Sequence, residues 1–137
     1  MTWPVRHLSQ SVAASPEDVA AFAGDPARLP LWAAGVSAGI RHDNGRWLTR
    51  SPMGEVEVRF IGPVDRGILD HEVVMPDGTV VFNALRVLAN DGGSEVVFSL
   101  FQRPGMDAAD FEADARLVRQ DLARLREVVE GSPAPGE

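Results

Sequence analysis

The chain has 137 residues, 45% of them hydrophobic, and a formal net charge of −7. This length suits a single domain with a substantial core, and the hydrophobic content argues against disorder. The negative charge argues against nucleic acid or an anionic membrane surface as a partner. No cysteine is present, which excludes disulfides and thiolate metal sites. Since no apolar run approaches the roughly 20 residues of a membrane span and no signal peptide is recognisable, we expect a cytoplasmic protein.

The N-terminal part of the sequence predicts a strand followed by two short helices. Residues Val5 to Ala14 alternate loosely in polarity, as strand residues do. Ser15 is a suitable N-cap and Pro16 a suitable first helical residue, so a helix should begin there. A second short helix is expected from Ala27 to about Ala33, bent or partly 3₁₀ because Pro30 lies inside it.

Six short strands should follow, because turn signals recur at the spacing of an antiparallel meander. Asp-Gly and Asn-Asp-Gly-Gly are hairpin signals among them. The expected strands are Val36 to His42, Arg46 to Ser51, Glu55 to Ile61, Gly67 to Met75, Thr79 to Ala89 and Ser94 to Arg103.

A long amphipathic helix is predicted from Asp107 to Glu130. Its apolar residues recur at steps of three and four, which places them on one stripe, and charged residues fill the other faces. Asp107 is suited to the N-cap, and Gly131 to the end of the helix. The stripe must be buried against a partner, which should be the sheet. The stripe consists of Phe111, Ala115, Val118, Leu122, Leu125 and Val129.

This element order resembles the helix-grip arrangement of the START-like, polyketide-cyclase-like superfamily, often called SRPBCC. The segment from Val12 to Val19 looks like that family's first strand running into its first helix. The hairpin from Gly92 to Phe98 and the amphipathic terminal helix match as well. The resemblance implies an α+β fold in which a curved antiparallel sheet wraps a long C-terminal helix and encloses a cavity for a hydrophobic small molecule. We expect one such domain over residues 1–131 and a flexible tail over residues 132–137.

Hairpin pairing predicts which residues face this cavity, since directly opposed residues share a face of the sheet. A two-residue turn after Ser51 sets Trp47 opposite Val58. A four-residue loop between the last two strands sets Leu85 opposite Phe98. The opposite faces of these strands carry most of the charged residues, so both pairs should point inward.

The hairpin closed by Asp77-Gly78 decides the position of a polar pair. A two-residue turn there sets Glu72 opposite Asn83 inside the cavity and leaves His71 outside. A tight turn at Asp65-Arg66 would instead place His71 inside, unless a bulge follows Phe60 and reverses the parity. We follow the Asp-Gly turn and expect Glu72 and Asn83 to face each other in the cavity.

The predicted cavity wall combines these pairs with large apolar residues, and Trp32 should gate its mouth. The expected ligand-binding residues are Trp32, Trp47, Phe60, Glu72, Asn83, Leu85, Phe98, Leu100 and Val118. No metal or cofactor is expected. The three histidines lie on separate predicted strands without metal-ligand spacing, and no Gly-rich phosphate loop or nucleophile elbow is present.

Two functions stay open at this point, and no catalytic residue is assigned. The first is binding of an aromatic, polyketide-like or lipid-like molecule, which needs an apolar cavity with a few polar anchors. The alternative is a cyclase, aromatase or dehydratase, in which Glu72 or His71 would act as acid or base and Asn83 would donate to a substrate carbonyl. A third and weaker interpretation is an interaction protein that uses an exposed sheet edge or a dimer interface, so a homodimer also stays open.

Overall fold

The computed structural model describes residues 1–131, and the predicted tail over residues 132–137 lies outside them. Strands and helices follow one another in the order that the sequence predicts, with three short 3₁₀ segments among them. The elements are β1 (Val5–Val12), α1 (Pro16–Ala23), η1 (Pro26–Leu31), η2 (Ala34–Val36), β2 (Arg41–Asp43), β3 (Arg46–Ser51), β4 (Gly54–Phe60), η3 (Val64–Arg66), β5 (His71–Val74), β6 (Val80–Asn90), β7 (Gly93–Phe101) and α2 (Ala108–Gly131).

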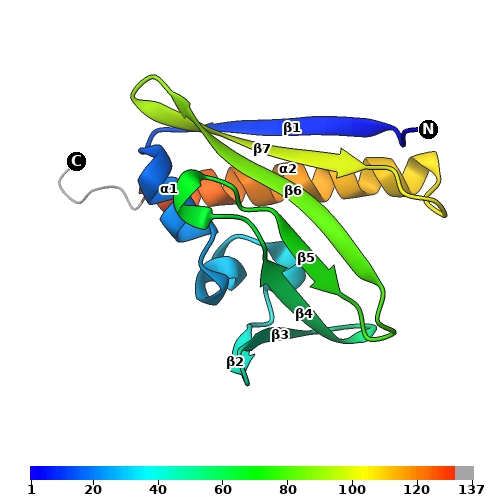
Figure 1. Ribbon diagram of the computed structural model, residues 1–137. Helices are drawn as coiled ribbons and strands as arrows, with labels where there is room; N and C mark the ends of the chain where they lie inside the picture. The colour runs from blue at the N-terminus through cyan, green and yellow to red at the C-terminus, as the bar shows by residue number, and fades with distance from the viewer. Residues whose placement is uncertain (132–137) are drawn as a thin grey trace.

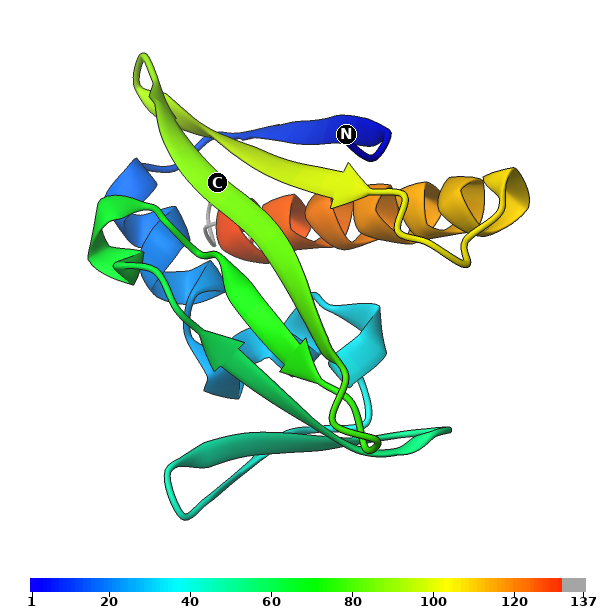
Figure 2. The same cartoon turned by 45° about the vertical axis from the view of Figure 1, so that its right-hand side comes forward.

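One antiparallel sheet holds all seven strands, in the order β1-β7-β6-β5-β4-β3-β2. The sheet is strongly curved, and α2 runs along its concave side beside β1 and β7 (Figure 1). Figure 2 shows α1, η1 and η2 on the same side of the sheet as α2. The predicted α+β helix-grip architecture is confirmed.

The predicted helix starts are confirmed in detail. Ser15 caps α1, because its Oγ accepts a hydrogen bond from the Asp18 amide at 3.1 Å. Pro30 lies inside η1, which is a 3₁₀ helix as expected. Asp107 and Asp110 cap α2 reciprocally: each side chain accepts a hydrogen bond from the other residue's backbone amide, at 2.8 and 3.2 Å.

The apolar stripe of α2 faces the sheet, but it is not uniformly buried. Ala115, Leu122 and Leu125 are fully buried in the core. Phe111 and Val118 were also expected to be buried, yet both are half-buried at its margin. Val118 packs against the core but keeps some exposure because it also borders a cavity.

Two predicted strands are wrong in extent. The segment expected as a strand from Val36 to His42 begins as η2 and is extended only in β2. Gly39 interrupts it with a φ of +112°, a conformation that other residues rarely adopt. The strand expected from Gly67 shrinks to the four residues of β5, because η3 and Gly67 precede it. A side chain at Gly67 would collide with the Val87 carbonyl oxygen, so the close approach to β6 requires glycine here.

The register of two hairpins is confirmed and that of a third is wrong. Trp47 lies opposite Val58, and Leu85 lies opposite Phe98, as predicted. In the β5–β6 hairpin, however, His71 lies opposite Asn83. The turn contains three residues rather than two, because the Met75 amide donates to the Thr79 carbonyl at 2.8 Å and Pro76 joins Asp77 and Gly78 in the loop, where Gly78 has a φ of +90°. One extra loop residue moves His71 to the inner face and Glu72 to the outer face.

Candidate functional site

An apolar cavity of about 210 Å³ lies between α2, the η1 and η2 segment, and the inner face of strands β4 to β7. Six of the nine predicted ligand-binding residues line it: Trp32, Phe60, Asn83, Leu85, Phe98 and Val118. Further apolar side chains complete the wall, among them Leu29, Val36, Val58, Val73 and Leu122. Only a few polar groups reach this surface, and they come from His71, Asn83 and Asp121.

His71 presents a neutral imidazole to the cavity. Its Nδ1 lies 3.0 Å from the Leu69 carbonyl oxygen. A carbonyl can only accept a hydrogen bond, so Nδ1 carries the proton and Nε2 keeps a free lone pair. Burial is the main cause that lowers the pKa of His71, so the ring is uncharged at pH 7. The Nε2 atom is therefore a hydrogen-bond acceptor on an otherwise apolar wall.

The Asn83 side chain is the neighbour of this acceptor. Its Nδ2 lies 3.4 Å from His71 Nε2, which is long for a hydrogen bond. The Phe60 ring packs on the other side of the imidazole, with ring centroids 5.4 Å apart. A ligand donor can displace the long Asn83 contact at little cost, and the Asn83 amide is then free to pair with a second ligand atom.

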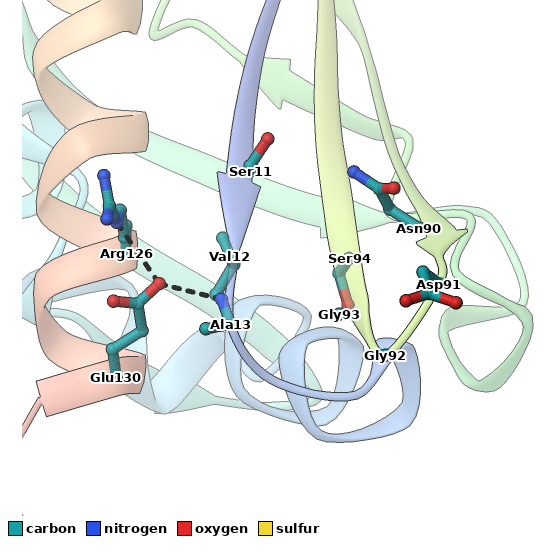
Figure 3. Close-up of a pocket in the computed structure, with 10 residues that line it drawn as sticks. All are labelled: Ser11, Val12, Ala13, Asn90, Asp91, Gly92, Gly93, Ser94, Arg126 and Glu130. Carbon is teal, nitrogen blue, oxygen red and sulfur yellow. Dashed lines mark hydrogen bonds and ion pairs between the residues drawn. The ribbon is translucent and has the colours of Figure 1, made fainter.

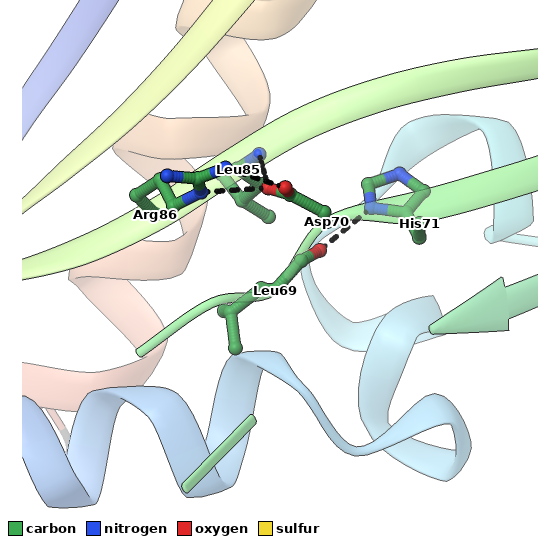
Figure 4. A network of polar contacts seen from close by, with 5 residues as sticks. All are labelled: Leu69, Asp70, His71, Leu85 and Arg86. Atoms are coloured by element: carbon green, nitrogen blue, oxygen red, sulfur yellow. Dashed lines mark hydrogen bonds and ion pairs between the residues drawn. The ribbon is translucent and has the colours of Figure 1, made fainter. Parts of the chain in front are cut away.

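An ion pair on the outer face of the sheet holds His71 in place (Figure 4). Arg86 donates to the Asp70 carboxylate through Nε at 2.9 Å and through Nη2 at 2.7 Å. The Leu85 amide donates to the same carboxylate at 3.0 Å. These hydrogen bonds, those from Arg86 foremost, lower the pKa of Asp70. Because successive strand residues point to opposite faces, tying Asp70 outward directs His71 into the cavity.

Asp121 of α2 is a functional candidate that sequence reasoning missed. We assigned the charged residues of this helix to its solvent-facing sides, yet Asp121 lines the cavity. Its Oδ1 accepts a hydrogen bond from the Ala34 amide at 3.1 Å, and burial raises the pKa of its carboxyl group. The sequence spacing does indicate that Asp121 faces inward. Asp121 follows Val118 by three residues and precedes Leu125 by four, which places it on the apolar stripe.

Trp32 separates the cavity from the surface. Its side chain lines both the inner cavity and an outer groove shared with Leu31 and Arg124. The residue is only 7% exposed, and within residues 1–131 its indole Nε1 has no hydrogen-bond partner. Arg124 donates to the Leu31 carbonyl at 3.3 Å and so ties this segment to α2. Trp32 therefore lies where the predicted gate of the cavity should be. The opening of this gate stays a prediction.

Three residues expected in the cavity wall lie elsewhere. Because the register of the β5–β6 hairpin differs from the predicted one, Glu72 is on the outer face. There Arg59 donates to its carboxylate at 3.1 Å. Trp47 has the predicted strand partner, but the sheet curves away there and its indole stacks on His42, with ring centroids 4.7 Å apart. Leu100 lines a neighbouring outer groove rather than the cavity itself.

That outer groove continues the cavity towards solvent. It shares Asn83, Phe98, Val118 and Asp121 with the cavity, and its outer part includes Arg103 and Asp114 among its lining residues. The cavity therefore has a polar rim at the end of β7 and the first turns of α2.

A larger groove, of about 450 Å³, lies between the β6–β7 hairpin and the end of α2, and its character is different. Figure 3 shows Arg126 and Glu130 of α2 facing Ala13, while Asn90 and Asp91 come from the hairpin. Glu130 accepts hydrogen bonds from the Ala13 amide at 2.8 Å and from Arg126 at 3.2 Å. The Ala13 amide is the main cause that lowers the pKa of Glu130. These contacts fasten the end of α2 to the segment that follows β1.

Neither a metal centre nor a membrane span is found in the part of the chain that the structure describes. Over residues 1–131 no group of three or more His, Asp or Glu side chains is placed to hold a metal ion. Among the same residues, no helix is both long and apolar enough to cross a bilayer.

The curved antiparallel sheet that wraps a C-terminal helix over an apolar cavity defines a helix-grip protein. Residues 6–130 match the model of the family described as polyketide cyclase / dehydrase and lipid transport. The chain therefore belongs to this family, and the resemblance to the SRPBCC superfamily is confirmed. No curated protein matches the chain.

Solved structures agree on the fold at low sequence identity. XoxI from Bacillus cereus is 14% identical with a TM-score of 0.71, and the alignment covers 91% of this chain and 94% of that one. The Aha1 dimer from Colwellia psychrerythraea is 15% identical with a TM-score of 0.69, covering 96% and 99%. DynU16, from the dynemicin biosynthetic locus, is 17% identical with a TM-score of 0.66, covering 94% of this chain but 48% of its own.

Proposed function

We propose that this protein binds a small aromatic molecule that carries a hydrogen-bond donor, in the cavity between α2 and the sheet. The observation that carries the proposal is the 3.0 Å contact of His71 Nδ1 with the Leu69 carbonyl oxygen, which leaves Nε2 as an acceptor on an apolar wall. A buried acceptor without a good partner is unfavourable, and a ligand hydroxyl group would supply that partner. The family's description, which includes lipid transport, supports a hydrophobic ligand.

The dimensions and surface of the cavity favour a flat ligand of one or two rings. Its volume of about 210 Å³ is below the roughly 300–1,000 Å³ of pockets for drug-sized ligands. Trp32, Phe60 and Phe98 supply aromatic surfaces on which a ring can pack in offset or edge-to-face arrangements. A longer ligand would need the outer groove beside Leu100 as well.

Acid–base catalysis is a second candidate function, favoured by the same histidine. A neutral imidazole in a mostly apolar cavity can accept a proton from a bound hydroxyl or carbon acid. The amide of Asn83, next to Nε2, can stabilise a carbonyl oxygen that gains charge. This arrangement would suit the cyclase or dehydrase chemistry named in the family's description.

The test of binding is to compare 1-naphthol with naphthalene by isothermal titration calorimetry. The wild-type protein should bind 1-naphthol about 5- to 10-fold more tightly, since a neutral hydrogen bond contributes about 1 kcal/mol. The His71→Phe variant should lose that preference and still bind naphthalene. The matched control is Glu72→Gln, the next residue on the outer face, which should bind both probes as the wild type does.

Two results would contradict the proposal. If neither probe binds the wild-type protein, the cavity is not a site for aromatic molecules. If His71→Phe keeps the full preference for 1-naphthol, the hydroxyl group is recognised elsewhere. Native mass spectrometry of the purified protein, searching for a co-purified molecule, would identify the natural ligand directly.

A further inference from the structure

Asp121 gives the cavity a negative charge that nothing in the described structure neutralises. It is the one formally charged residue on the cavity wall over residues 1–131, because His71 is neutral there. None of the ion pairs within those residues involves Asp121. Oxygen Oδ1 accepts from the Ala34 amide, while Oδ2 has no hydrogen-bond partner among the described residues.

The surrounding cations are placed outside the cavity. Arg103 lines the outer groove, where Asp114 lies as well. Arg124 lines the groove on the other side of Trp32, where it donates to the Leu31 carbonyl and lies 3.6 Å from Glu127. Asp121 borders both of these grooves as well, but within residues 1–131 neither arginine forms an ion pair with it, so the inside of the cavity stays negative.

The rest of the wall also favours a cation. Trp32, Phe60 and Phe98 line the same cavity, and the face of an aromatic ring attracts a positive charge within about 6 Å of its centre. Burial raises the pKa of Asp121, which means that the charged carboxylate is less favourable there than in water. An ammonium group beside it would relieve that cost.

We propose that the cavity selects aromatic ligands that bear a protonated amine, with the ammonium group paired to Asp121 and the rings against the apolar wall. The inference rests on the proposed binding function and specifies the charge of the ligand. By the same reasoning the cavity discriminates against carboxylates such as free fatty acids, because their charge would repel that of Asp121.

The experiment uses three probes with one ring system and different charges. They are 1-naphthylmethylamine, 1-methylnaphthalene and 1-naphthoate, which are cationic, neutral and anionic at pH 7. Titration of the intact protein should show the amine binding at least ten-fold more tightly than the neutral probe, and the naphthoate binding most weakly.

Asp121→Asn is the variant that assigns the preference to its residue. Asparagine keeps an oxygen that can accept from the Ala34 amide, so the local fold should survive, and thermal unfolding checks this. The variant should lose about ten-fold in affinity for the amine and bind 1-methylnaphthalene as before. Asp114→Asn is the matched control on the same helix, because it changes the net charge equally but lies outside the inner cavity.

The outcomes separate this inference from the proposed function. If the wild type binds the amine and the neutral probe equally, or Asp121→Asn keeps the preference, the charge selection is wrong while aromatic binding stands. If Asp114→Asn weakens amine binding as much as Asp121→Asn does, the preference arises from overall charge and the site assignment is wrong. If no naphthalene probe binds, both proposals are wrong.

Discussion

Asp70 and His71 are neighbours in the chain, but their side chains point to opposite faces of the sheet. The Asp70 side chain is 10% exposed and is held by Arg86 and by the Leu85 amide. His71 projects from the next position into the cavity. The orientation of the candidate ligand-binding residue therefore depends on an ion pair that the ligand does not touch.

Asp70→Asn should destabilise the fold and change its response to acid. The carboxyl group has a pKa below its ordinary 3.8 in the folded protein, so the unfolded chain binds the proton first. Its stabilisation is therefore complete above about pH 5 and is lost as the pH falls through 4 towards the folded pKa. At pH 7 the substitution should lower the free energy of unfolding by about 1–3 kcal/mol, an amount limited because Arg86 is 49% exposed.

The measurement is urea unfolding of the wild type and the variant at several pH values. The difference in stability should shrink as the pH falls from 5 to 3. Glu55→Gln, which breaks an exposed pair with Arg41, is the control and should change little at any pH. A constant difference across this range would show that the charge of Asp70 is not what stabilises the fold.

At the scale of single elements, the β5–β6 hairpin shows where sequence reasoning succeeds and where it stops. The turn was located correctly between two strands, although β5 is shorter than the strand predicted there. The length of the turn was predicted wrongly, because Pro76-Asp77-Gly78 can form either a two-residue or a three-residue loop. Only packing of the whole sheet selects one of them. Since side chains alternate between faces, that single residue exchanged Glu72 for His71 in the cavity.

The cavity wall likewise contains residues that could be predicted from the sequence and residues that could not. Leu85, Phe98 and Val118 could be predicted, because hairpin pairing and apolar periodicity indicate which face is buried. Trp32 was predicted as a large apolar residue in the short segment that contains Pro30. Trp47 could not be excluded, since the curvature that carries it away from the cavity is a property of the assembled sheet. Asp121 was missed because a charged residue on an apolar stripe is normally assigned to solvent.

Gly78→Ala should weaken the hairpin that places His71. The φ of Gly78 is +90°, and no atom lies within 4 Å of where a Cβ would stand. The cost is therefore one of backbone conformation alone, about 1–2 kcal/mol in the free energy of unfolding. Gly92→Ala is the control, because it has the same open space without a positive φ and should be neutral or slightly stabilising. Equal stability of the two variants in chemical denaturation would mean that the turn relaxes to another form.

At the scale of the whole molecule, the proposed ligand binding should be linked to stability, because the cavity walls come from both ends of the chain. Leu29 and Trp32 contribute from the N-terminal side, Phe98 from the sheet, and Val118 and Leu122 from the C-terminal helix. A ligand that needs all of these walls binds the folded protein and not the unfolded one, so it must raise the free energy of unfolding.

Saturating ligand should therefore raise the melting temperature. With 1-naphthol at about 100 times its dissociation constant, the gain is about 2.7 kcal/mol, or roughly 5–15 °C for a domain of this size. The same concentration should shift His71→Phe by less, because its dissociation constant is larger. Differential scanning fluorimetry measures both shifts, and an unchanged melting temperature at saturation would exclude binding that is specific to the folded state.

The pairing of β1 with β7 has a consequence for how the chain acquires its fold. Val5 lies opposite Phe101, so one edge of the sheet joins the start of the domain to a strand that follows all the others. During synthesis β1 emerges first and waits without its partner until β7 and then α2 have left the ribosome. Contacts this distant in sequence slow folding, because a long loop must close before any of them forms. The edge that completes the sheet should thus form late, and until then the apolar residues of β1, such as Leu8 and Val12, depend on chaperones or transient contacts for cover.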